Sequence, residues 1–294
     1  MFSVNLAASV PSFLPVFTGV RGRRILGSSL RAAVGGIILS VGRLSPQLAS
    51  GIGKERGLTT KSTTMAPSVI ASRVRLSAAA LIIAGCLFVL YPAIRPFSDE
   101  VSLQGAAAFA SPNWLAAHML AMVAFTLLPL GLLGLHTILQ ETAVEHLGFW
   151  AIVLSWIGIG LTLPYYGGEA YGLHAIGQEA LRRQSANLMS LADVVRSGPG
   201  LVMFAAGLLL LAVAAITVAV AVWRSDRLPK WSGVPFAIGF ALYIPQFYGS
   251  QPLRVAHGLL VAIGCVWLAV VLWRQSSKRN GAPPISERGD GPFA

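Results

Sequence analysis

The sequence predicts an all-α integral membrane protein, a bundle of about six transmembrane helices arranged as three hairpins. The composition indicates this first, because 55% of the 294 residues are hydrophobic and only 11% are charged, against roughly 25% charged in ordinary soluble domains. Long apolar stretches approach the roughly 20 residues that a helix needs to cross a hydrocarbon core about 30 Å thick. A pattern of prolines and aromatic residues then ends and restarts these stretches three times.

Six apolar stretches are the candidate spans. They cover residues 76–94, 114–135, 147–166, 201–223, 231–248 and 253–273. The third and fifth are the shorter ones, because Pro164 and Pro245 lie near their ends.

Each hairpin is predicted from a helix that ends at a proline with aromatic neighbours, a polar turn, and a second proline that opens the return helix. The proline pairs are Pro92 with Pro112, Pro164 with Pro199, and Pro245 with Pro252. Proline is favourable at the first helical position because its missing N–H would have no partner there. The pattern is typical of an internal repeat, although helices that end at the same membrane interface would share it without one.

Residues 1–64 precede the predicted membrane domain at 65–275 and form a leader rich in Ser, Gly and Arg. The leader has eight Lys or Arg and one acid, so it carries +7 of the net charge of +11. This composition is typical of a disordered or targeting segment, and the alternative is a mis-assigned start, with Met65 as the first residue. Residues 276–294 are predicted to form a disordered cytoplasmic tail. Because the basic excess lies in the leader and not on a compact face, nucleic-acid binding is not indicated.

The distribution of basic residues predicts both termini on the cytoplasmic side of an inner or plasma membrane. Arg73 and Arg75 precede the first span, and Arg224, Arg227 and Lys230 lie between the fourth and fifth. The residues after the sixth span are basic as well. Lys and Arg concentrate in cytoplasmic loops, so the proline–aromatic helix ends would all face outward.

Two histidines are predicted at similar depth inside the membrane. His118 follows Pro112 by six residues and His257 follows Pro252 by five, which places both roughly 8–9 Å below the outer helix ends. Ionisable groups inside a span usually face the bundle interior or a water-filled cavity. The pair is therefore a candidate shared site, as metal or haem ligands or as a proton-handling pair. The structural alternative is that each neutral imidazole makes one hydrogen bond between helices.

Further residues complete a candidate polar layer at the outward end. They are Glu169, Tyr165, Tyr166, His174, Arg95 and Arg254. Glu169 is expected near the membrane surface, either in a substrate vestibule or within an ordinary interfacial belt of aromatic residues. Arg95 and Arg254 flank the first and sixth spans, where they either form an anion site with Asp99 and Glu100 or simply extend to the interface.

The segment 174–195 is predicted to form an amphipathic helix that lies over the outer membrane surface. It would act either as a cap over a cavity or as a connector that buries its own apolar face.

Recognised catalytic motifs are absent from the sequence, including a P-loop and a nucleophile elbow. This favours a non-enzymatic protein and leaves an enzyme as the open alternative. Cys86 and Cys265 lie inside apolar spans and indicate neither a disulfide nor a cysteine-rich metal site. The sequence specifies no cofactor, and its expected partner is the lipid bilayer. A homo-oligomer or a membrane complex is left open.

The core of the chain resembles small polytopic membrane proteins of actinobacterial type, a group with no assigned functional family. The resemblance rests on Arg95-Pro96 with Asp99-Glu100, Trp114-x-x-x-His118, the run from Pro164 to Leu173, and Pro245-Gln246-Phe247. It covers most of the chain, implies residence in a bacterial inner membrane, supports the Met65 start, and carries over no catalytic residue.

Two functions fit these residues. The first is a non-enzymatic membrane protein that binds or passes a small solute or ion through an outward-facing polar vestibule, which helices interrupted by Pro and Gly near polar residues favour. The second is a membrane-embedded haem- or metal-binding redox protein that uses His118 and His257 as ligands. A structural subunit of a larger complex is the third reading.

Overall fold

The computed structural model of the chain describes residues 67–280, and within that range the chain forms helices and turns but no strand. Five helices are long and apolar enough to cross a membrane, which fits an integral membrane protein. The all-α helical bundle is therefore confirmed. The predicted leader at 1–64 and the last part of the predicted tail, 281–294, lie outside the described residues.

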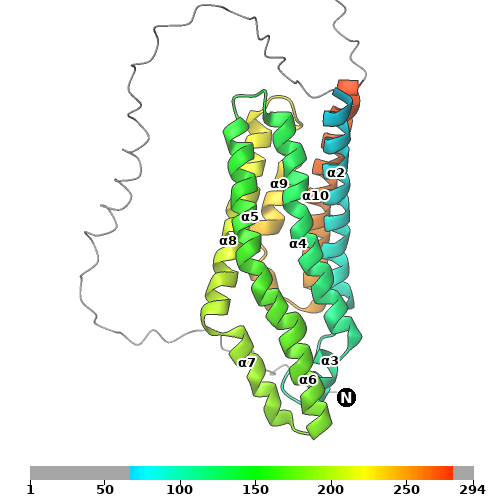
Figure 1. Cartoon of the computed structure of the whole chain (residues 1–294), viewed down its shortest axis with the longest axis vertical. Coiled ribbons are helices and arrows are strands. Elements are labelled where there is room, and N and C mark those ends of the chain that lie inside the picture. The colour runs from blue at the N-terminus through cyan, green and yellow to red at the C-terminus, as the bar shows by residue number, and fades with distance from the viewer. Residues whose placement is uncertain (1–66, 281–294) are drawn as a thin grey trace, which may run out of the picture. The chain divides into compact units, whose positions relative to one another are not determined.

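The five long helices are α2 (Pro67–Ile94), α4 (Pro112–Leu139), α5 (Glu145–Gly167), α8 (Gly198–Arg224) and α10 (Gln251–Asn280). α2 and α5 run in one direction along the bundle, and α4, α8 and α10 run in the other (Figure 1). The start of α4 shows the expected local cause: the Ser111 hydroxyl accepts a hydrogen bond from the Trp114 N–H at 3.2 Å, and Pro112 occupies the first turn. We call the end where α2 ends and α4 begins the polar end. The start of α2 and the end of α10 lie together at the opposite end (Figure 1).

The predicted hairpin partners pack against each other: α2 with α4, α5 with α8, and α9 with α10. Glycines permit close approach at these and other contacts. A Cβ atom on Gly207 of α8 would lie 2.6 Å from the Gly158 carbonyl oxygen of α5. A Cβ atom on Gly258 of α10 would lie 2.4 Å from the Phe88 carbonyl oxygen of α2. Small residues therefore bring the backbones together, as expected where lipid supplies no hydrophobic drive between helices.

The predicted span at 231–248 is a series of short helices, so five long helices are present where the sequence predicts about six. The segment consists of η3 (Lys230–Gly233), α9 (Val234–Ala241) and η4 (Pro245–Tyr248). Pro245 has no N–H to donate to the Ala241 carbonyl, which interrupts the helical hydrogen-bond ladder. The segment still packs between α8 and α10.

The third predicted span continues past Pro164 and its aromatic neighbours, where the sequence predicts that it ends. α5 is followed without a break by a π-helix, η1 (Gly168–Gly172), and by α6 (Leu173–Arg183). The continuous stretch Glu145–Arg183 has 39 residues, about 58 Å of helix against a hydrocarbon core about 30 Å thick. A proline inside a membrane helix is tolerated where neighbouring groups satisfy the freed backbone atoms.

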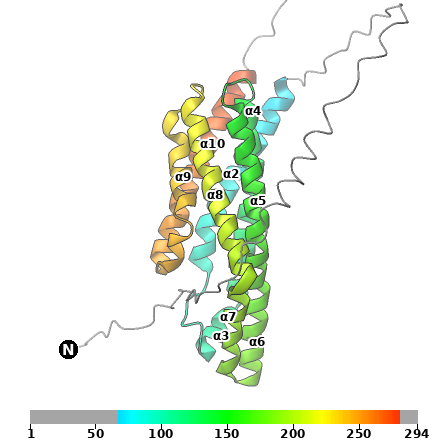
Figure 2. The same ribbon diagram turned by 90° about the vertical axis from the view of Figure 1, so that its left-hand side faces the viewer.

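The segment 174–195 is not one surface-lying helix. Its first part, α6, extends in line with α5, and the chain then returns through η2 (Ala186–Ser190) and α7 (Leu191–Arg196). Together with α3 (Leu103–Phe109) these elements form what we call the cap, which projects beyond the ends of α9 and α10 (Figure 2). The cap has its own apolar core with Trp114 of α4: Ala106, Phe109, Leu173, Ala180, Met189 and Ala192.

The last helix extends past the predicted boundary of the tail. α10 continues to Asn280, whereas the tail is predicted to begin at residue 276. The Ser276 hydroxyl donates to the Trp273 carbonyl at 2.7 Å and accepts from the Arg75 Nε of α2 at 3.4 Å. These bonds hold the last turns of α10 against the first turns of α2.

Candidate functional site

Glu169 lies in the π-helix that joins the bundle to the cap. A π-helix is rare and is frequently found at functional sites. Within this π-helix, the Glu169 carbonyl accepts a hydrogen bond from the Trp114 indole N–H at 2.7 Å. Trp114 is fully buried. The position of Glu169 is therefore set by a side chain of α4 as well as by its own helix.

Arg196, the last residue of α7, joins two carboxylates. Its Nε and Nη2 donate to the two carboxylate oxygens of Glu169 at 2.6 and 3.0 Å. Its Nη1 donates to Glu100 Oε2 at 2.6 Å. Such forked contacts are the stronger kind of ion pair. Although burial opposes the charge, the two carboxylates raise the pKa of Arg196 above its ordinary value.

Arg95 extends this network from the end of α2. Its Nη2 donates to Glu100 Oε1 at 2.9 Å, and its guanidinium carbon lies 4.5 Å from the Trp114 ring centroid. Arg95 is 6% exposed, and its Nε has no hydrogen-bond partner among the described residues. Glu100 has a left-handed backbone with φ of 58°, a conformation that costs energy in a non-glycine residue and is often found at functional sites.

His118 ends the network inside the bundle. The residue is 1% exposed. Its Nδ1–H donates to the Trp114 carbonyl at 2.7 Å, since a carbonyl can only accept, and its Nε2 lies 3.8 Å from Glu169 Oε2. In the neutral ring, Nε2 is an acceptor that faces a second acceptor. We call the five residues Arg95, Glu100, Arg196, Glu169 and His118 the ion chain.

Three buried tyrosines continue the polar contacts away from the ion chain. Tyr91 lies edge-on to His118, with ring centroids 5.6 Å apart, and Tyr91 and Tyr166 are 6.0 Å apart. The hydroxyls of Tyr166 and Tyr243 are 3.3 Å apart. The three rings come from α2, α5 and the turn after α9. Ring contacts and one pair of hydroxyls therefore connect three segments that lie far apart in the sequence.

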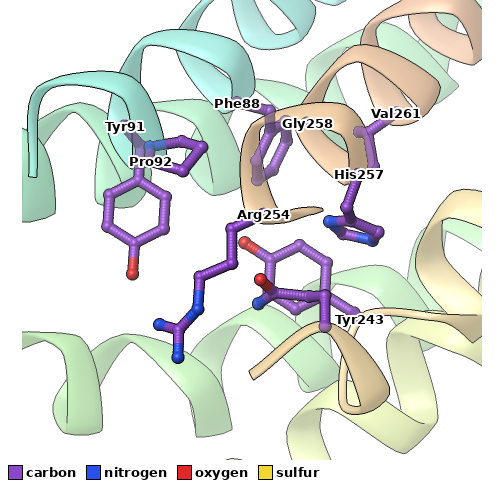
Figure 3. Close-up of a pocket in the computed structure, with 9 residues that line it drawn as sticks. Phe88, Tyr91, Pro92, Tyr243, Arg254, His257, Gly258 and Val261 are labelled. Carbon is purple, nitrogen blue, oxygen red and sulfur yellow. The ribbon is translucent and has the colours of Figure 1, made fainter. Parts of the chain in front are cut away.

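Beyond Tyr243 the structure forms a small pocket between α2, η4 and α10 (Figure 3). Its walls include Phe88, Tyr91, Tyr243, Arg254 and His257, and its interior has room for about one water molecule. The His257 Nε2–H donates to the Gly239 carbonyl at 2.8 Å, and the ring is edge-on to Tyr243, with centroids 5.2 Å apart.

The structure brings some of the predicted site residues together and separates others. His118, Glu169 and Arg95 belong to the ion chain, and Tyr166 contacts it. His257 is linked to that group only through Tyr243 and Tyr166. Each of the two predicted ligand histidines has one ring nitrogen bonded to a backbone carbonyl.

The remaining predicted residues have separate contacts. Tyr165 stacks on Phe204, with centroids 4.2 Å apart. The His174 Nδ1–H donates to the Phe109 carbonyl at 2.9 Å and so joins α6 to α3. Arg254 donates its Nε to the Gly249 carbonyl at 3.0 Å and its Nη2 to the Phe247 carbonyl.

Sequence reasoning missed the partners that complete the site. The sequence does not predict four of the residues at the site, which are Arg196, Trp114, Tyr91 and Tyr243. The available signal for Arg196 was the need of Glu169 for a cation, but Arg182, Arg183 and Arg196 all lie within the same stretch of sequence. Within residues 67–280, no group of three or more His, Cys, Asp or Glu is arranged to hold a metal ion.

Acid should weaken the attachment of the cap through Glu100. Burial alone would raise the pKa of this carboxyl, but Arg196 and Arg95 outweigh it and lower the pKa below the ordinary 4.5. A carboxyl with a depressed pKa in the folded state contributes stability that is fully present above the unfolded pKa and is lost as the pH falls through the folded pKa. We expect the melting temperature in detergent to decline below about pH 4.5. The decline should be shallower in Glu100→Gln, and an identical pH profile in that variant would contradict this role.

No family model, no curated protein and no solved structure matches this chain.

Proposed function

We propose that the protein is an integral membrane protein that binds a small ion at its polar end, and that this ion is a proton. The observation that carries the proposal is the pair formed by His118 and Glu169. The His118 Nδ1–H is committed to the Trp114 carbonyl, so Nε2 faces a carboxylate oxygen 3.8 Å away. A proton on Nε2 would turn two opposed acceptors into a donor and an acceptor.

The polar end has little internal space, which favours a proton over a larger solute as the bound ion. The polar contacts run through packed aromatic rings, and the pocket beside Tyr243 has room for about one water molecule. A proton moves along hydrogen-bonded groups and needs no cavity of its own. Glu169, with a side chain 12% exposed, is the carboxylate next to buried His118, and Arg196 holds it in place without accepting a proton, because a guanidinium has no acceptor atom.

Burial and charge act on this pair in opposite directions. Burial disfavours a charged imidazolium, while the nearby Glu169 carboxylate favours it. Arg196 and Arg95 keep the surroundings close to neutral, because they balance Glu100 and Glu169. Small changes in the ion chain would therefore change the occupancy of the proton site.

Tryptophan fluorescence tests the proposal directly. The Trp114 and His118 rings have centroids 4.5 Å apart, and a protonated imidazole quenches a neighbouring indole. We expect a component of the emission of the purified protein to decrease as the pH is lowered and His118 takes up a proton. It should disappear in His118→Gln, and its midpoint should change by about one pH unit or more in Glu169→Gln.

A second histidine–carboxylate pair provides a matched control. His136 Nε2 and Glu145 Oε1 lie 3.6 Å apart at the opposite end of the bundle. His136→Gln should leave the pH-dependent component of the emission in place. The proposal is wrong if His118→Gln has the same emission profile as the unmodified protein. Dye-loaded liposomes containing the protein then separate binding from passage, because only passage dissipates an imposed pH gradient faster than empty liposomes.

A further inference from the structure

Arg254 is a cation without an acidic partner. Arg95 and Arg196 both pair with Glu100, but no Asp or Glu among residues 67–280 lies within ion-pair distance of Arg254. Its hydrogen bonds go to two uncharged backbone carbonyls, those of Gly249 and Phe247, and neither bond uses Nη1. Partly buried cations are usually paired, so this one has capacity for an anion.

The position of Arg254 at the start of α10 disfavours the positive charge of its guanidinium. It lies in the first turn of a helix of 30 residues. The N-terminal end of a helix carries a partial positive charge, which favours an anion and disfavours a cation. A ligand with negative charge would be attracted by both the helix end and the guanidinium.

A second side chain in the pocket also lacks a partner. Gln246 lines the pocket and is 8% exposed, and its carboxamide makes no hydrogen bond to any described residue. The two amide atoms of Gln246 are not among the fully buried atoms that lack a partner, so solvent or a ligand can reach them. Figure 3 shows the Arg254 side chain extending between Tyr91 and Tyr243, and Gln246 lines the same pocket.

The surroundings of the pocket match the level of lipid headgroups. Exposed apolar side chains lie close to it: Leu253 is 56% exposed, Tyr248 75% and Phe97 36%. The Phe97 ring centroid lies 5.3 Å from the Arg254 guanidinium carbon. Basic and aromatic side chains at the end of a span are typical of the membrane interface, where lipid phosphates lie.

We propose that the pocket between α2, η4 and α10 binds a phosphate group, with Arg254 as the cation and the Gln246 amide as a second donor. The interior has room for about one phosphate oxygen, and the rest of the ligand would stay at the mouth. The source of the phosphate is either an anionic lipid or free phosphate, and the membrane interface favours the lipid. This site is independent of the proton pair, because neither of its two ligand-binding residues belongs to the ion chain.

Thermal unfolding of the full chain in a nonionic detergent tests the site with three probes at equal ionic strength. They are dioctanoyl phosphatidylglycerol, dioctanoyl phosphatidylcholine and sodium phosphate. We expect phosphatidylglycerol to raise the melting temperature saturably and phosphatidylcholine to raise it less. Saturable stabilisation by sodium phosphate at similar concentrations would support the phosphate site and identify the free anion as its source.

Variants locate the effect. Arg254→Gln should weaken the apparent affinity for phosphatidylglycerol by about tenfold or more, and Gln246→Leu should weaken it to a smaller extent. Arg182→Gln is the control, since Arg182 lies on the exposed surface of the cap and Glu179 keeps its pair with Arg183. Arg182→Gln should leave the affinity unchanged.

Three results would overturn the proposal. They are the lack of a saturable effect in the unmodified protein, an unchanged response in Arg254→Gln, and an equal loss in Arg182→Gln. If Arg254→Gln does not fold because it loses two backbone hydrogen bonds, Gln246→Leu decides, and an unchanged response in that variant overturns the site.

Discussion

Arg196→Ala is expected to destabilise the fold by about 3 kcal/mol, near the lower end of the range for breaking a buried ion pair. The guanidinium holds Glu169 and Glu100 by three hydrogen bonds of 2.6 to 3.0 Å. Its removal leaves the Glu169 carboxylate without an arginine partner and leaves Glu100 paired with Arg95 alone. The side chain is 17% exposed, so water offsets part of the loss. Chemical or thermal unfolding in detergent measures the change.

Two further variants separate the ion chain from general surface charge. Arg182→Ala removes an exposed arginine whose partner Glu179 retains Arg183, and it should cost about 0.5 kcal/mol or less. Glu169→Gln combined with Arg196→Ala should be less destabilising than the sum of the single changes, because the two residues interact directly. Equal effects of Arg196→Ala and Arg182→Ala would contradict the role of the ion chain.

Trp114→Ala is expected to have the largest effect of any single change at the site, about 3–5 kcal/mol. Trp114 is 0% exposed, belongs to the apolar core of the cap and packs against the His118 ring. Its indole N–H also holds the Glu169 carbonyl in the π-helix at 2.7 Å. The alanine variant loses the packed ring and that hydrogen bond together, which unfolding in detergent would report.

Trp114→Phe divides this effect into its two parts. Phenylalanine keeps an aromatic ring but leaves the Glu169 carbonyl without its donor, so we expect a cost of about 1–3 kcal/mol. Trp156→Phe is the matched control, because Trp156 is 59% exposed and the change should cost within about 0.5 kcal/mol. If Trp114→Phe proves as harmless as Trp156→Phe, the indole N–H does not support the π-helix.

The helices of this protein could be predicted from local composition, but their lengths could not. The pattern of prolines and aromatic residues correctly located the ends of the first and last hairpins near Pro92, Pro112 and Pro252. It failed at Pro164, where the helix continues because α4 and the cap satisfy and cover the region after the proline. It failed again at Pro245, where the lost N–H divides a predicted span into short helices.

The candidate site was also only partly predictable from the sequence. A carboxylate at Glu169 indicated that a cation must be near, since a charge at a membrane end needs a partner. The identity of that cation depends on the return of the chain through α7, which places Arg196 beside a residue 27 positions away and beside Glu100, 96 positions away. The arginines of α6 have the same charge but pair with Glu179 on the exposed surface.

Composition and the spacing of apolar residues determined that this chain folds as an all-α bundle suited to a membrane, because hydrocarbon requires each backbone to satisfy its own hydrogen bonds within a helix. The spacing of apolar residues along one helix does not indicate which side chains of another helix its own side chains will contact. The ion chain, the tyrosine contact between segments 77 residues apart and the Arg254 pocket therefore arise only when the helices pack. Close packing, through glycines such as Gly207 and Gly258, selects those neighbours.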